Sequence, residues 1–557
     1  MTEKKVVVSE WDSAPFLQKW TFSVANPLLR EGQKTSLQFD DLLQTPLRLT
    51  TQVVYTNLKN SYATAKRFLF IPKLMNALNY SNLHMIIINT IFTLMESALR
   101  IASPVVLGIF LRALIDKTTP VEEAYKYACI LGGMNLLQTF LHGISFFFAY
   151  GMGVGWRMSS IALIFDKLFH VRSESFANGT GKLVNLISND VSRFDEWGVF
   201  MVFYWETYLE LIAIFVILVY SLSVLPALAG VGTFLILIPP QLKLANDLAA
   251  QRTSIAIETD SRVRHTSEVI EGITSVKSFG WEKPFTALIG VFRAKEVSFI
   301  SKSQYLRSIF QGIYYSGSVL ATFATFSVFW AQGRTITIPL VFSTLSMIQV
   351  LKAVVSRNWT RAIETGSEAT ASCTRIDNFL NMPDALKEVS SPDEDANFTG
   401  SLVRIQNGVY GYAEAAVPTL RGVNIDVKPG ELVIVVGKVG CGKSSYLNAV
   451  LGEMTVLEGG EGPFSRKINP STRIAYCAQR PWILASSVRE NIVLASETSE
   501  EGSDEDLYKL AVESCCIVQD MSHWPAYDLT EIGERGVSVS VRVLSLLPPY
   551  FISEITL

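Results

Sequence analysis

One short run of the sequence has the composition and spacing of a loop that binds phosphate. The run reads Gly437, Lys438, Val439, Gly440, Cys441, Gly442, Lys443, Ser444, which matches the spacing G-x-x-x-x-G-K-[ST]. Its glycines allow the backbone to wrap closely around an anion, so that backbone N–H groups point at it. Lys443 would bring a cation to the β- and γ-phosphates, and the Ser444 hydroxyl would ligate Mg²⁺. The run therefore predicts a nucleotide site that includes Mg²⁺.

The residues on either side of the loop indicate which elements hold it in place. A fully apolar run, Leu432–Val436, precedes the loop and predicts a buried strand, and a helix is predicted directly after the loop. The N-terminal N–H groups of that helix would face the phosphates. Further short strands are predicted at Leu402–Ile405, Val409–Tyr412 and Val423–Val427. We therefore expect a soluble α/β domain from about residue 401.

The first two thirds of the chain have the composition of a membrane protein. Hydrophobic residues make up 49% of the 557 residues and charged residues 18%, against about 25% charged in typical soluble chains. Apolar runs of about 20 residues, each long enough to cross a bilayer, occur near 84–111, 126–152, 198–221, 224–244, 306–331 and 336–356. We therefore predict a polytopic α-helical membrane protein with the lipid bilayer as a partner.

Charge and cysteine content exclude other classes of protein and orient the spans. The net charge of −3 gives no basic field, so nucleic-acid binding has no support. The six cysteines match neither a disulfide framework nor a metal-binding spacing. Two long polar segments, 153–197 and 245–305, are rich in Lys and Arg, which indicates that they are cytosolic. Both termini are then cytosolic as well, while the choice between plasma and vacuolar membrane is not determined.

Six segments of the chain resemble one protein family in their order and spacing. They are Ser13–Gly32, Leu183–Trp197, Thr259–Phe285, Pro418–Ser445, Arg473–Ile492 and Glu531–Gly536. Together they resemble the N-terminal half of an ATP-binding cassette exporter of the C subfamily, which holds the multidrug-resistance-associated proteins, the sulfonylurea receptors and the cystic-fibrosis channel. The resemblance implies a six-helix exporter-type membrane domain followed by an α/β P-loop nucleotide-binding domain, with ATP and Mg²⁺ as cofactors.

The resemblance assigns roles to three residues beyond the phosphate loop. Tyr412 stands where the family places an aromatic ring that stacks on adenine, and Ser445 would support the α-phosphate. Gln479 matches a loop glutamine that reaches Mg²⁺ and the attacking water, so it is the expected catalytic residue and a second metal ligand. Tyr412 as an ordinary core aromatic and Gln479 as a surface residue are the alternatives.

The expected domains follow from the spans, the composition and the resemblance. They are a cytosolic N-terminal segment with an interfacial or elbow helix at 1–82, the six-span domain at 83–382, a polar linker at 383–400, a partial nucleotide-binding domain at 401–536 and an atypical tail at 537–557. Val539–Val543 stands where the family has a Leu-Ser-Gly-Gly-Gln signature, and no catalytic acid follows. Whether the chain hydrolyses ATP is therefore uncertain, because half of the hydrolytic machinery has no counterpart here.

Three functions remain open from the sequence. The first is the ATP-binding half of an exporter of organic anions or conjugates, which would need a second transmembrane and nucleotide-binding half. The second is an ATP-regulated channel or receptor-regulatory subunit, and the third is a non-catalytic truncated fragment. Within the spans, Glu96 and Arg100 are predicted to form an internal ion pair. The segments Asn189–Trp197 and Ser278–Phe285 are candidates for docking onto nucleotide-binding domains. Their aromatic residues would either dock or be buried locally, and docking is the favoured role for Trp281 and Phe285.

Overall fold

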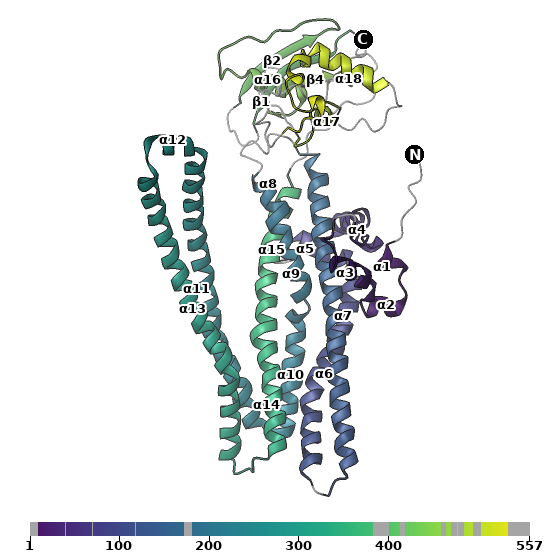
Figure 1. Cartoon of the computed structure of the whole chain (residues 1–557), viewed down its shortest axis with the longest axis vertical. Coiled ribbons are helices and arrows are strands. Elements are labelled where there is room, and N and C mark those ends of the chain that lie inside the picture. The colour runs from purple at the N-terminus through teal and green to yellow at the C-terminus, as the bar shows by residue number, and fades with distance from the viewer. Residues whose placement is uncertain are drawn as a thin grey trace. The chain divides into compact units, whose positions relative to one another are not determined.

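The computed structural model divides the chain into two compact units. The first is formed by Met1–Val171 and Phe176–Asp384, and the second by Arg172–Ser175 and Ala385–Leu557. The structure describes residues 9–38, 41–68, 71–116, 118–171, 181–382, 400–412, 418–457, 464–468, 476, 484–493 and 503–532. The first unit is helical, and the second combines a small sheet with short helices (Figure 1).

Five helical stretches of the first unit are long and apolar enough to cross a membrane, within the part of the chain that the structure describes. They are α6 (Leu83–Ile115), α7 (Val121–Leu168), the run Gly181–Leu222, α11 (Val224–Glu271) and the run Ile338–Leu380. The predicted fifth span, 306–331, lies in α13 (Glu282–Ala331). Helix α13 is long enough but falls short in hydropathy, because Tyr, Ser, Thr and Gly interrupt its apolar residues. The sixth crossing therefore stays a prediction.

Two of these runs are made of several successive helical segments. Gly181–Leu222 comprises α8 (Gly181–Asn185), the π-helical η5 (Leu186–Asp190), α9 (Val191–Phe200) and α10 (Phe203–Leu222). Ile338–Leu380 comprises α14 (Ile338–Lys352), the π-helical η6 (Ala353–Trp359) and α15 (Thr360–Leu380). The π-helical η6 lies where its run passes from the apolar α14 to the more polar α15, whereas η5 lies within the more polar part of its run.

The longest helices exceed the thickness of a bilayer. Helices α7 and α11 have 48 residues and α13 has 50, which at 1.5 Å per residue is about 70 Å, against about 30 Å of hydrocarbon. Helices α11 and α13 run side by side, and the short α12 (Ile273–Phe279) joins them at their far end (Figure 1). The long polar segments predicted as loops are thus mainly helical continuations of the spans.

Short N-terminal helices pack against the side of this bundle, beside α7 (Figure 1). They are α1 (Glu10–Ser13), α2 (Phe16–Trp20), η1 (Ser23–Ala25), α3 (Asn26–Gly32), η3 (Leu47–Leu49), α4 (Thr51–Thr64) and α5 (Lys73–Ser81). Leu58 of α4 and Leu74 of α5 are fully buried beside Trp156 of α7. The Trp156 indole N–H donates to the Leu78 carbonyl at 3.0 Å, which satisfies its buried polar atom.

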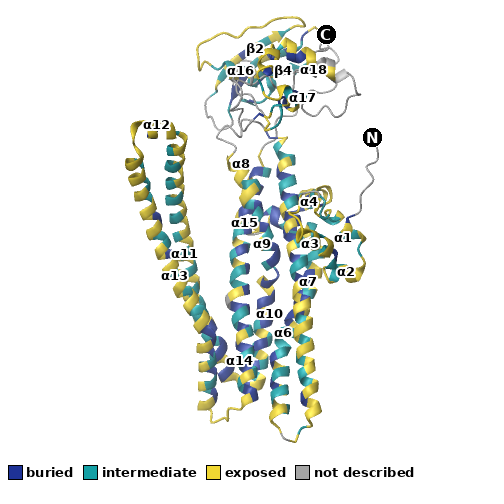
Figure 2. Ribbon diagram, viewed as in Figure 1, coloured by how far each residue is buried: buried dark blue, intermediate teal, exposed yellow. Residues whose placement is uncertain are grey.

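The helices of the bundle differ in how far they are buried. Figure 2 shows buried residues gathered on α9, α10 and α14, whereas the upper parts of α11 and α13 are mostly exposed. Phe194, which we predicted to lie in a docking segment, is fully buried in the same cluster as Trp156. Of the two alternatives that the sequence leaves open for the aromatic residues of Asn189–Trp197, local burial holds for Phe194, and docking of the segment stays a prediction.

The second unit contains a four-stranded antiparallel sheet. Its strands are β1 (Val403–Gly411), β2 (Leu420–Val427), β3 (Thr455–Val456) and β4 (Ser465–Ile468), and the other three all pair with β1. The two strands predicted at 402–405 and 409–412 are in fact one strand. Its register shifts between Ile405 and Gly408, where Asn407 has a φ of +52°, so the polar break in the sequence marks a β-bulge and no turn.

Helices complete this unit. They are α16 (Lys443–Leu451), α17 (Val488–Val493), α18 (Ser503–Ser514), α19 (Val518–Met521) and η8 (Tyr527–Leu529). Ala449 of α16 is fully buried with Ile405 and Tyr410 of the sheet. This contact fixes α16, and with it the loop that precedes it.

Candidate functional site

Backbone geometry explains the glycines of the phosphate loop. Gly440 and Gly442 have φ angles of +83° and +97°, which side-chain-bearing residues rarely adopt. A Cβ at Gly437 would lie 2.6 Å from the Cys441 Sγ, so a larger residue would displace the loop. The Cys441 N–H donates to the Lys438 carbonyl at 3.3 Å and closes the turn. The loop conformation thus favours glycine at 442, which the motif specifies, and also at 440, which the motif leaves free.

Helix α16 begins at the end of this loop, with Gly442 as its N-cap residue. The first N–H groups of a helix have no partner within the helix, and they carry the positive end of its dipole. Ser444 is exposed in the first turn, whereas Ser445 beside it is buried. The helix therefore presents backbone donors and one hydroxyl at the position where the motif predicts phosphates.

The Lys443 ammonium lies over its own loop. Its Nζ donates to the carbonyl oxygens of Gly437 and Lys438, both at 2.9 Å, and lies 3.9 Å from the Cys441 Sγ. Both acceptors are neutral oxygens of an exposed loop. A phosphate at the N-terminus of α16 would offer the ammonium a stronger, charged acceptor within reach of its flexible side chain.

Tyr412 and Ser445 are brought together although they lie 33 residues apart. The two hydroxyl oxygens are 2.7 Å apart, which links the end of β1 to the first turn of α16. The Tyr412 ring is half-buried and packs against the sheet cluster that includes Ile405. The structure thus places the predicted adenine-stacking residue beside the phosphate loop, while the stacking itself stays a prediction.

The segment before the loop, which was predicted to be a buried strand, differs from that prediction. Leu432–Val436 forms no strand and has no ladder partner among the residues described, and Leu432 and Val436 are 83% and 86% exposed. The prediction of a strand there is wrong for this structure. An apolar strand of this type is stable only when neighbours pair with its edges and cover its faces, and composition alone does not supply them.

The donor set of the site fits a nucleotide phosphate with Mg²⁺. It combines helix N–H groups, an ammonium and a hydroxyl, which are the groups that hold phosphates in P-loops. No group of three or more His, Cys, Asp or Glu side chains able to hold a metal occurs in the described ranges. That Ser444 ligates the metal together with phosphate oxygens stays a prediction. The predicted second ligand, Gln479, lies outside the described residues, as does the predicted tail at 537–557.

An ion-pair cluster that the sequence did not reveal stabilises the C-terminal helices of this unit. Arg489 of α17 contacts Asp528 at 3.1 Å and also pairs with Glu505 of α18. The Tyr508 hydroxyl donates to the same Asp528 carboxylate at 3.1 Å. Burial, with the hydrogen bond to Asp528, raises the pKa of Tyr508, and the bond to Glu505 raises the pKa of Arg489. The cluster is structural, because its charges are all used internally.

The tip between α11 and α13 presents aromatic rings to solvent. The rings of Phe279 and Trp281 stack at 4.8 Å, and their residues are 66% and 48% exposed. Phe285 lies 6.5 Å from Trp281 and is half-buried. Exposed stacked aromatics at the end of a long helical hairpin are typical of a docking element. The predicted docking role of Ser278–Phe285 fits this geometry and stays a prediction.

Within the helical bundle, the predicted pair of Glu96 and Arg100 is present, with the Arg100 Nη1 3.6 Å from the Glu96 Oε1. The sequence did not reveal that two further carboxylates join it. Glu206 and Glu210 of α10 lie 3.7 Å and 2.8 Å from the Arg100 Nη2. Glu206 and Glu210 are four residues apart on an apolar helix, and this spacing could have indicated that they share one face.

Comparison with known proteins places both units in one family. The family model described as ABC transporter transmembrane region matches residues 86–354, and the one described as ABC transporter matches residues 420–536. The chain is 31% identical to ATP-binding cassette sub-family C member 4 of Mus musculus over 525 residues, which cover 92% of this chain and 38% of the relative.

Two further relatives are similar over most of the chain. ATP-binding cassette sub-family C member 3 of Mus musculus is 28% identical over 473 residues, covering 84% of this chain and 30% of the relative. ABC transporter C family member 8 of Dictyostelium discoideum is 28% identical over 428 residues, covering 76% and 26%. The chain thus spans between about a quarter and two fifths of the length of these relatives.

Proposed function

The chain belongs to the ATP-binding cassette (ABC) transporters, and we propose that it is the ATP-binding half of an ATP-driven exporter of the C subfamily. The observation that carries the proposal is the loop at Gly437–Ser444, which joins helix α16 in the same chain as five helices able to cross a membrane. Organic anions or conjugates are the proposed cargo, by similarity to multidrug-resistance-associated proteins.

The proposal assigns each site residue a task. Gly437, Gly440, Cys441 and Gly442 shape the loop, and backbone N–H groups of the loop and of α16 bind the phosphates. Lys443 exchanges its two carbonyl acceptors for the β- and γ-phosphates. Bound Mg²⁺ would neutralise charge on the phosphates. At the edges of the site, Ser444 would ligate the metal, Ser445 would support the α-phosphate, Tyr412 would stack on adenine, and Gln479 would orient water and reach the metal.

A second half completes the proposed transporter. Hydrolysis needs groups on the far side of the nucleotide that position water and stabilise charge, and we propose that a partner cassette takes part in supplying them. The aromatic tip at Phe279 and Trp281 would dock onto a nucleotide-binding domain and transmit its movement to α11 and α13 as a rigid body. The protein would lie in the plasma or vacuolar membrane with both termini cytosolic.

Transport into vesicles distinguishes an exporter from a channel or a regulatory subunit. The chain is co-expressed with a complete second half, and inside-out vesicles are supplied with a labelled anionic conjugate and ATP. An exporter accumulates the conjugate above its outside concentration, and Lys443→Ala removes this accumulation. Lys438→Ala is the control, because it removes a cation from the same loop at a position that the motif leaves free. Equilibration without accumulation would favour a channel and contradict the proposal.

A further inference from the structure

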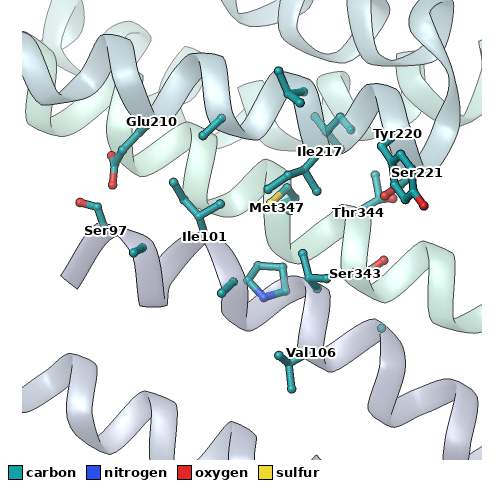
Figure 3. Close-up of a pocket in the computed structure, with 18 of the residues that line it drawn as sticks. Ser97, Ile101, Val106, Glu210, Ile217, Tyr220, Ser221, Ser343, Thr344 and Met347 are labelled. Atoms are coloured by element: carbon teal, nitrogen blue, oxygen red, sulfur yellow. The ribbon is translucent and has the colours of Figure 1, made fainter. Parts of the chain in front are cut away.

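A cavity of about 910 Å³ lies inside the helical bundle, between α6, α10 and α14. This volume is in the range of sites for drug-sized molecules. Figure 3 shows Ser97 and Glu210 at one end of the cavity and Tyr220, Ser221 and Thr344 towards the other. Apolar side chains, among them Ile101, Ile217 and Met347, line the space between the two ends. The cavity is therefore polar at its ends and apolar in its middle.

The end at Glu210 is rich in carboxyl groups. Glu206 and Glu210 line the cavity wall, and the side chains of Glu96, Glu206 and Glu210 share a single guanidinium, that of Arg100. His142 adds a contact of 3.1 Å between its Nδ1 and the Glu96 Oε1. Three carboxyl groups thus face one permanently charged cation, Arg100.

One carboxylate oxygen in this cluster lacks a partner. Glu206 is 1% exposed, and its Oε1 accepts a hydrogen bond from the Ser97 hydroxyl. Its Oε2 is buried and makes no hydrogen bond to any described residue. A buried polar atom without a partner is costly, and ionisable residues inside membrane spans usually face a cavity or a partner. The geometry thus provides an acceptor at a cavity wall that a donor from a ligand would satisfy.

The Glu206 oxygen lacks a partner, but the guanidinium of Arg100 is already paired and is not available to an anionic ligand. Three carboxylates already surround it, and it does not line the cavity. The other arginine near the cavity is Arg112, which does line it. Arg112 lies 12 residues further along α6, about 18 Å from Arg100 at 1.5 Å per residue. A ligand head group at Glu206 would therefore meet negative charge and lie far from the Arg112 cation.

We propose that this cavity binds a lipophilic cation, an amine or onium compound with a bulky apolar body. The cationic head would lie against Glu206 and Glu210, and the body would fill the space lined by Ile101, Ile217 and Met347. The inference goes beyond the proposed function, because it concerns a ligand of opposite charge to the proposed cargo and needs no nucleotide. It rests only on residues of the helical unit.

A pair of ions with the same shape and opposite charge tests the proposal. The full chain is purified in lipid nanodiscs without ATP, and binding of radiolabelled tetraphenylphosphonium is measured. Unlabelled tetraphenylphosphonium should displace the label, and tetraphenylborate should not. Glu206→Gln and Glu210→Gln should each weaken binding roughly tenfold or more, as expected for losing a charged partner. Equal displacement by both ions, or unchanged affinity in both variants, would overturn the proposal.

A variant with the opposite expected effect separates binding from folding damage. Arg100→Gln removes the cation that competes for the carboxylates, so it should strengthen tetraphenylphosphonium binding, whereas misfolding would weaken it. Glu123→Gln is the matched control, because Glu123 is exposed in the first turn of α7 and lies outside the cavity. Lys443→Ala should leave cation binding unchanged, so failure here and failure of the ATP site are distinguishable. Weaker binding in Arg100→Gln protein that retains its size-exclusion profile would contradict the charge argument.

Discussion

The phosphate loop and the bundle cavity are two proposed ligand sites of opposite charge and opposite construction. The loop places an ammonium and helix N–H groups on one continuous stretch of eight residues, whose shape depends on Gly440 and Gly442. The cavity joins carboxylates from α10 to wall residues of α6 and α14, which are distant in sequence. A site made from backbone depends on local conformation, whereas a site made from side chains of several helices depends on packing.

The largest expected effect breaks the loop by changing one backbone position. Gly442→Val places a β-branched residue at a φ of +97°, with its Cβ 3.3 Å from the Leu420 Cδ2, so the loop must change shape. We expect complete loss of labelling by a photoreactive ATP analogue, with tetraphenylphosphonium binding retained. Gly290→Val, at an exposed site in α13 with no neighbour near its Cβ, is the control. Labelling that survives in Gly442→Val would show that the loop conformation does not determine binding.

A second acidic site sharpens the comparison, because its carboxylate is fully paired. Glu296 of α13 accepts from the Thr259 hydroxyl at 2.7 Å and from Arg262 and Arg293 at 2.8 Å and 2.7 Å. One carboxylate with two cations has no charge left for a ligand. We expect Glu296→Gln to lower the unfolding temperature by a few degrees and to leave tetraphenylphosphonium affinity unchanged. Weaker cation binding in this variant would indicate that any lost carboxylate in the bundle has the same effect.

The same residue predicts how stability depends on pH. Hydrogen bonds from Thr259, then from Arg262 and Arg293, lower the pKa of Glu296 to about 2. A lowered pKa in the folded state means that the stabilisation is present above the ordinary value of 4.5 and is lost as pH falls towards 2. Thermal unfolding in detergent should therefore show a smaller difference between wild type and Glu296→Gln at pH 3 than at pH 7. A constant difference would contradict this pairing.

The smallest expected effect concerns the link between the sheet and α16. Tyr412→Phe removes the hydroxyl that contacts Ser445 at 2.7 Å and keeps the ring. A single hydrogen bond of this kind contributes about 1 kcal/mol, so ATP affinity should change by no more than roughly tenfold. Tyr412→Ala also removes the ring and should weaken labelling further if the ring stacks on adenine. Equal affinities for the Phe and Ala variants would exclude the stacking role.

Features that depend on local conformation could be predicted from the sequence, whereas features that depend on packing between distant segments could not. The conformation at Gly440 and Gly442 and the start of α16 at Lys443 depend on neighbouring residues, and the motif contains all of them. The apolar helices depend on composition over about 20 residues, so they could also be predicted from the sequence. The structure of Leu432–Val436 could not be predicted, because an apolar run indicates burial but does not supply the strands that must pair with it.

Contacts between distant segments escaped prediction for a similar reason. Arg100 and Glu210 are 110 residues apart, and only the packing of α6 against α10 brings them to 2.8 Å. Packing of α9 against α7 and α15 buries Phe194, which is one of the two outcomes that the sequence left open for it. Tyr412 and Ser445 were each assigned a task from family resemblance, but their direct contact was not foreseen.

The central claim, that this chain binds ATP through the loop before α16, is tested most directly by photolabelling the purified full chain. Labelling with a photoreactive ATP analogue at saturating Mg²⁺ is compared between wild type, Lys443→Ala and Lys438→Ala. We predict that Lys443→Ala abolishes labelling that unlabelled ATP displaces, because the ammonium now held by the Gly437 and Lys438 carbonyls is the cation that meets the phosphates. Lys438→Ala should label as wild type does. Unchanged labelling of Lys443→Ala would contradict the assignment of the site.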